Sequence, residues 1–136
     1  MARILALDYG VKRTGIAVTD MLQLIASGLT TVPTSELMDF LKKYVFEESV
    51  SLIVIGEPKQ MNNIVSESEF HIQGFLNELK NELPQIEVVR VDERFTSKIA
   101  SRTMLEGGLK KKKRRDKGLI DQISATIILQ SYLDTK

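Results

Sequence analysis

Apolar runs at the start of the chain follow the two-residue period of β-strands. Residues 3–9 and 14–20 are such runs, and the four-residue GVKR connection between them is typical of a hairpin. Residues 24–33 form a third extended segment, which Pro33 ends. The pattern therefore predicts three consecutive strands joined by short turns.

From Ser35 onward the apolar residues follow a helical period, interrupted by two further strand-like runs. The expected order of these later elements is helix, strand, helix, strand, helix and helix, at residues 35–45, 51–56, 66–83, 86–92, 96–106 and 119–133. Three hairpin-linked strands followed by such an alternation predict an α/β domain in which helices pack on a mixed sheet.

Length and composition exclude several classes of protein. The 136 residues carry no internal repeat, so we expect residues 1–136 to form one domain. The absence of cysteine excludes disulfides, thiolate metal sites and cysteine nucleophiles, and the single histidine excludes a histidine-rich zinc site. No apolar run approaches the length of a membrane span and no signal peptide precedes the first strand, so we expect a cytoplasmic protein without a membrane partner.

The net charge of +1 conceals one strongly basic segment. Residues 110–117 carry seven cations and one anion, so the remainder of the chain has a net charge of about −5. We expect residues 107–118 to form a mobile loop, either simply solvated or in salt-sensitive contact with nucleic-acid phosphates. Because no aromatic residue interrupts the basic run, base stacking is not expected there.

Acidic residues stand at the ends of the expected elements. Asp8 ends the first strand, Asp92 and Glu93 end the last strand, and Asp121 lies near the start of the last helix. Because strand ends and helix starts meet along one edge of such sheets, these carboxylates are expected to converge there and to repel one another. A divalent cation relieves that repulsion, and oxygen-only ligands favour Mg²⁺ or Mn²⁺.

Side-chain alternation restricts which acids can meet. Asp8 shares a face of its strand with Ala6, whereas Asp92 and Glu93 must point to opposite faces if both keep strand geometry. We favour Glu93 as the partner of Asp8, because its longer side chain suits the very end of a strand. Structural roles stay open, since a strand-end aspartate is a common turn former and Asp121 could serve the helix dipole.

Three ordered motifs resemble the YqgF family, also called RuvX, within the ribonuclease H-like superfamily. They read LALDYGVKRTGIAVTD, VDERFTS and LIDQISATIIL. The resemblance implies a ribonuclease H-like fold, with a five-stranded mixed sheet and helices on both faces. It also implies a metal-dependent nuclease whose acidic positions map onto Asp8, Glu93 and Asp121. Members of this family are described as nucleases that mature the 5′ end of pre-16S ribosomal RNA, and an analogy with RuvC first suggested Holliday-junction resolution.

On this interpretation the three acids bind two Mg²⁺ (or Mn²⁺) ions, and the residues around them contact the nucleic acid. Gly10 and Gly15 are expected to let the backbone approach a phosphate closely. The expected phosphate-binding cations are Lys12, Arg13, Arg94, Lys110, Lys111, Lys112, Lys113, Arg114 and Arg115.

The chain departs from the family pattern at two places. The middle motif reads IGEPKQMNN, with Glu57 where an apolar residue is common and Asn63 near the usual glycine. Glu57 is either a solvated loop acid or a supporting ligand. In the closing motif Ser124 replaces an alanine.

Three other functions compete with the ribosomal RNA nuclease. Holliday-junction resolution would require a symmetric dimer, whereas the sequence carries no decisive dimer signal and we expect a monomer or a weak dimer. A non-catalytic RNA-binding module for pre-ribosomal particles would keep the fold without turnover. An actin-like ATPase would need two such domains, and 136 residues supply only one.

Overall fold

The computed structural model describes residues 2–57, 67–92 and 117–135. Its strands are β1 (Arg3–Asp8), β2 (Arg13–Thr19), β3 (Ala26–Pro33), β4 (Val50–Glu57) and β5 (Glu87–Asp92). Its α-helices are α1 (Leu37–Glu47), which follows a short 3₁₀ turn (Thr34–Glu36), α2 (Glu67–Glu82) and α5 (Lys117–Asp134). Among these described residues, none of the helices combines the length and the hydropathy that a membrane span needs.

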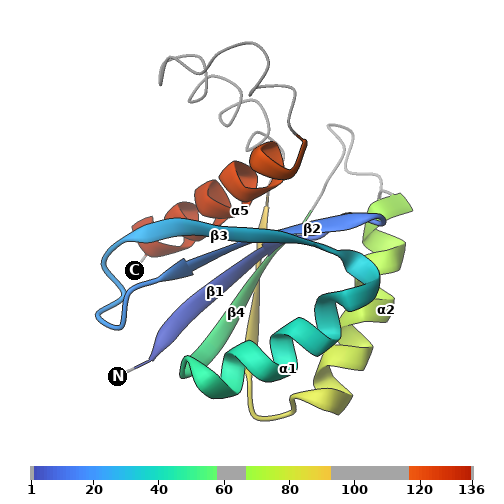
Figure 1. The fold of residues 1–136 in the computed structure, drawn as a ribbon, viewed down its shortest axis with the longest axis horizontal. Helices are drawn as coiled ribbons and strands as arrows, with labels where there is room; N and C mark the ends of the chain where they lie inside the picture. Colours follow the sequence, from blue (N-terminus) through green and yellow to red (C-terminus); the bar gives the residue numbers. More distant parts are fainter. Residues whose placement is uncertain (1, 58–66, 93–116, 136) are drawn as a thin grey trace.

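The strands form one five-stranded mixed sheet in the order β3-β2-β1-β4-β5. The first three strands pair antiparallel, whereas β4 pairs parallel with both β1 and β5. Helices α1 and α2 cover one face of the sheet and α5 crosses the other (Figure 1). The predicted mixed sheet with helices on both faces is confirmed.

Alternating side chains of the strands supply a separate core to each face. Odd-numbered residues of β1 pack with α1 and α2, in a cluster that includes Leu5, Leu7, Ile53, Ile55, Leu41 and Leu79. Even-numbered residues pack with α5, in a cluster that includes Ile4, Ala6, Leu52, Val54, Ala125 and Ile128. Asp8 therefore continues the row of β1 side chains that faces α5.

Most boundaries differ from the predictions by one or two residues, and two of these differences have a physical cause in the structure. The basic loop predicted at 107–118 ends earlier, because Lys117 already begins α5. The third strand begins at Ala26 rather than residue 24, because a turn precedes it in which the Asp20 carboxylate accepts three backbone N–H bonds of 2.8–3.1 Å. The predicted helix at 96–106 and the basic residues 110–115 lie outside the described residues.

Helix α5 rests directly on β2 at Gly15, which pairs with Asp8 across the β1–β2 ladder. A Cβ added at Gly15 would overlap the backbone carbonyl of Asp121 and lie 2.8 Å from its Cβ. The expectation that Gly15 clears space for a phosphate is therefore wrong, because helix α5 fills that space. The glycine instead sets how closely the aspartate of α5 approaches the end of β1.

Gly15→Ala should lower the free energy of unfolding by about 1–3 kcal/mol, because backbone atoms must move to admit the methyl group. Urea denaturation monitored by circular dichroism measures the change. Gly74→Ala is the matched control, since a Cβ at this glycine of α2 meets no heavy atom within 4 Å. That variant should gain up to about 1 kcal/mol from helix propensity. Equal urea midpoints for Gly15→Ala and the wild type would contradict the packing role.

Candidate active site

Asp8 ends β1 and Asp121 lies in the first turns of α5, close enough for the charge of Asp121 to act on the Asp8 carboxyl group. The Ser124 hydroxyl, one helical turn after Asp121, donates a hydrogen bond to the partly buried Asp8. Burial raises the pKa of Asp8 to about 7, and the negative charge of Asp121 contributes to the same rise, while the bond from Ser124 opposes both effects. Ionising Asp8 next to Asp121 is thus costly in the protein alone.

This arrangement suits a divalent cation. Two neighbouring carboxylates whose joint ionisation is unfavourable offer hard oxygen ligands, which Mg²⁺ and Mn²⁺ prefer. Within the ranges that the structure describes, no cluster of three or more metal-ligating side chains assembles. Glu93, the third acid in the prediction, lies outside these ranges and stays a prediction.

The two other acids near the strand ends point away from Asp8. In β5, Val89 and Val91 pack in the core beneath α5, so the alternation places Asp92 on the opposite face. In β4, Ile53 and Ile55 pack with α1 and α2, and Glu57 shares their face. Neither Asp92 nor Glu57 shares the strand face of Asp8.

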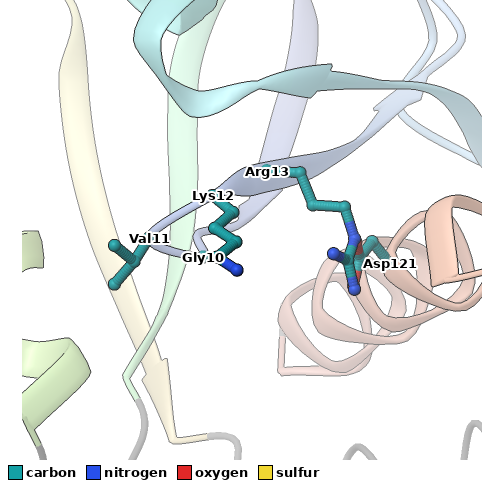
Figure 2. A pocket seen from close by; sticks show the side chains of 5 residues that line it. All are labelled: Gly10, Val11, Lys12, Arg13 and Asp121. Carbon is teal, nitrogen blue, oxygen red and sulfur yellow. The ribbon is translucent and has the colours of Figure 1, made fainter.

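A pocket of about 250 Å³ opens beside Asp121, at the turn between β1 and β2. It is lined by Gly10, Val11, Lys12, Arg13 and Asp121 (Figure 2). Three of these residues, Gly10, Lys12 and Arg13, were predicted to contact nucleic acid, and the structure places them together. The remaining predicted cations, Arg94 and residues 110–115, lie outside the described residues.

Arg13 makes a contact that the sequence did not indicate. Its Nε donates to Oδ2 of Asp121 at 2.5 Å, so that the guanidinium spans from β2 to α5 (Figure 2). The predicted phosphate ligand Arg13 thus contacts the predicted metal ligand Asp121.

Threonines of the β3 region hold the two sides of this pocket, and sequence reasoning missed them. Thr34 donates its hydroxyl to the Gly10 carbonyl at 2.6 Å, and its N–H donates to the Lys12 carbonyl at 3.0 Å. Thr31 donates to the Gly118 carbonyl of α5 at 2.6 Å. Only the β2–β3 register, which pairs Gly15 with Thr31, could have pointed to this role.

A second polar cluster supports the strand that adjoins β1. Arg90 donates to both carboxylate oxygens of the buried Glu69 at 2.7 and 3.0 Å. The same guanidinium donates to the carbonyls of Ile55 and Gly56 at 3.3 and 3.0 Å. This bidentate pair fixes the end of β4 to α2, on the face opposite to Asp8.

Thr34→Val should lower both nucleic-acid affinity and cleavage rate about three- to tenfold, because the Gly10–Lys12 turn loses a hydrogen bond worth about 1 kcal/mol. Fluorescence anisotropy and single-turnover cleavage give the two values. Thr34→Ser keeps the hydroxyl and should restore both. A serine variant as defective as the valine variant would contradict the role of the bond from the Thr34 hydroxyl to Gly10.

A family model described as Holliday junction resolvase, RuvX, matches residues 2–135. The chain belongs to the RuvX family. Relatives in Bacteroides fragilis and Phocaeicola vulgatus, both named "Putative pre-16S rRNA nuclease", are 65% and 62% identical over 136 residues. These matches cover all of this chain and 99% and 98% of the relatives.

Solved structures of RuvC share the fold. A Thermus thermophilus RuvC bound to a Holliday junction gives a TM-score of 0.61 at 15% identity, over 99% of this chain and 96% of that one. Another Thermus thermophilus RuvC structure gives 0.53 at 12% identity, over 98% and 97%. The predicted ribonuclease H-like fold and RuvX membership are therefore confirmed.

Proposed function

We propose that this RuvX protein is a metal-dependent nuclease that processes the 5′ end of pre-16S ribosomal RNA in the cytoplasm. The observation that carries the proposal is the electrostatically interacting pair Asp8 and Asp121, in which burial of Asp8 and the charge of Asp121 raise the pKa of Asp8 to about 7. The names of the relatives from Bacteroides fragilis and Phocaeicola vulgatus support the choice of substrate.

Asp8 and Asp121 would hold Mg²⁺ or Mn²⁺ together with Glu93. Such ions, when bound, activate a water as nucleophile and stabilise the leaving oxygen of the phosphodiester. The alternation in β5 supports the choice of Glu93 over Asp92, because Asp92 lies on the face away from Asp8.

The other residues of the site would bind and position the substrate. Ser124 fixes the orientation of the Asp8 carboxylate through its hydrogen bond. Lys12, exposed on the pocket wall, would contact a phosphate next to the scissile one. The Gly10–Lys12 turn, held by Thr34, keeps that cation in place.

The basic residues Lys110–Arg115 would add affinity without sequence preference. Replacing all six with glutamine should weaken RNA binding and reduce the slope of log K against log salt by about 0.7 for each phosphate that the variant no longer neutralises. Anisotropy titrations from roughly 50 to 200 mM salt, where phosphate binding weakens steeply, measure the slope. Substituting Lys42 and Lys43 of α1, on the face opposite to α5, should leave it unchanged. An unaltered slope in the six-residue variant would exclude phosphate binding by this segment.

The substrate is tested by offering two labelled nucleic acids side by side in Mg²⁺ and in Mn²⁺. One is a pre-16S RNA fragment that spans the mature 5′ end, and the other is a four-way DNA junction. The proposal predicts metal-dependent cutting of the RNA at the mature end and no paired cutting of the junction. Pre-ribosomal particles form a third substrate, which would be required if the site closes only on the assembled particle.

Holliday-junction resolution is the second candidate, and the fold shared with the junction-bound RuvC favours it. A resolvase must place two sites on paired strands, which requires a symmetric dimer. Symmetric nicks in the junction, with a dimer by light scattering, would replace the ribosomal proposal. A monomer or weak dimer that cuts RNA but not the junction would support the ribosomal proposal.

A further inference from the structure

The ion pair between Arg13 and Asp121 occupies one of the proposed metal ligands. The two side chains come from positions 108 residues apart, and Nε lies 2.5 Å from Oδ2. The Arg13 side chain is 38% exposed and that of Asp121 is 19% exposed, so the pair closes one wall of the open pocket. Arg13 therefore offsets part of the negative charge that Asp121 places beside Asp8.

We propose that Arg13 takes the place of a metal ion at Asp121 in the free protein and is released to bind phosphate when the metal arrives. This inference rests on the proposed metal-dependent function. A divalent cation and a guanidinium repel each other and would compete for the same carboxylate oxygen. A metal ion that binds at Asp121 must therefore break the Arg13–Asp121 pair, or it must bind with one ligand atom fewer.

The pocket offers the released side chain a new partner. Arg13 lies on the same wall as Lys12, above a volume of about 250 Å³, and a planar guanidinium suits a phosphate as well as a carboxylate. Figure 2 shows that the side chain reaches Asp121 from the start of β2, so rotation about its own bonds can move the charged group into the pocket. The metal would thus prepare the protein for nucleic acid.

Two measurable consequences follow. In the absence of nucleic acid, Arg13 should weaken metal binding by a factor that reflects the strength of its partly exposed ion pair with Asp121. It should also couple the two ligands, so that metal tightens nucleic-acid binding and nucleic acid tightens metal binding by the same factor.

The first test is calorimetric titration of Mn²⁺ into the protein without nucleic acid. Arg13→Gln should bind Mn²⁺ about two- to fivefold more tightly than the wild type. Lys12→Gln removes the same charge from the same pocket and should change the affinity less than about twofold, because an exposed charge that does not contact the carboxylate is screened. Asp121→Asn should bind Mn²⁺ weakly, whether alone or combined with Arg13→Gln or Lys12→Gln.

The outcomes separate this inference from the proposed function. Equal Mn²⁺ affinities in wild type and Arg13→Gln, or equal gains in the Arg13 and Lys12 variants, would overturn the role of Arg13 and leave the metal site standing. Absence of Mn²⁺ binding in all variants would overturn the metal-dependent function itself. Thermal unfolding of each variant in chelator confirms that the proteins compared are folded.

The second test measures the coupling. Anisotropy of a labelled pre-16S RNA fragment is recorded in chelator and in Ca²⁺, which takes the same kind of oxygen ligands as Mg²⁺. The wild type should gain more affinity from the ion than Arg13→Gln, by about the factor found in calorimetry. An equal gain in both proteins would contradict the release of Arg13 towards phosphate.

Discussion

Asp8→Asn should reduce Mg²⁺-dependent cleavage of the RNA by at least about a thousandfold. This corresponds to about 4 kcal/mol of transition-state stabilisation that the carboxylate provides through the ions it would hold. The substitution keeps the size of the side chain and an oxygen that can accept the hydrogen bond from Ser124. The effect is therefore expected on the rate of the chemical step, with the fold intact. Single-turnover cleavage with excess enzyme measures that rate.

Asp92→Asn is the control for this variant. Asp92 also ends a strand, but alternation places it on the face away from Asp8. We expect the rate to fall by less than about tenfold, in line with a residue that supports a turn rather than an ion. A fall as large as that of Asp8→Asn would move the third ligand from Glu93 to Asp92. Near-normal cleavage by Asp8→Asn would remove Asp8 from the site.

The same Asp8→Asn substitution should stabilise the metal-free protein at neutral pH. Between pH 3.8 and about 7 the unfolded chain releases the Asp8 proton while the folded protein retains it, because the pKa of Asp8 is raised by burial and by Asp121. Wild-type stability therefore falls as the pH rises through this window and stays low above it. Asparagine does not titrate, so the variant escapes the penalty.

The difference between the pKa values of Asp8 in the folded and unfolded protein should make Asp8→Asn more stable than the wild type by about 4 kcal/mol above pH 7. Below pH 4 the two proteins should have almost the same stability. Urea denaturation in chelator at pH 4, 6 and 8 measures the difference between variant and wild type. Asp20→Asn is the control, because backbone N–H donors lower the pKa of that exposed carboxyl, so its effect should vary little between pH 4 and 8. A constant difference for Asp8→Asn across this range would contradict the raised pKa.

Local patterns were sufficient to predict the mixed sheet and the face of β1 on which Asp8 lies. The alternation of Ile4, Ala6 and Asp8 predicts a shared face, and the structure places this row against α5. Composition misled at Lys117 and Gly118, which resemble the basic loop but begin a helix. Contact with β3 sets where α5 begins, since the Thr31 hydroxyl donates a hydrogen bond to the Gly118 carbonyl.

The contacts within the site could not be predicted in the same way. The Arg13–Asp121 pair depends on how closely α5 approaches β2, which is set by the missing side chain of Gly15. The bond from Thr34 to Gly10 depends on the register of an edge strand. The raised pKa of Asp8 depends on burial, which no motif encodes.

The most direct test of the metal centre is anomalous diffraction from crystals soaked in Mn²⁺. We predict a peak within coordination distance of a carboxylate oxygen of both Asp8 and Asp121, with the Arg13 guanidinium moved away from Asp121. Mn²⁺ bound only at other carboxylates, with the Arg13–Asp121 pair intact, would contradict the account.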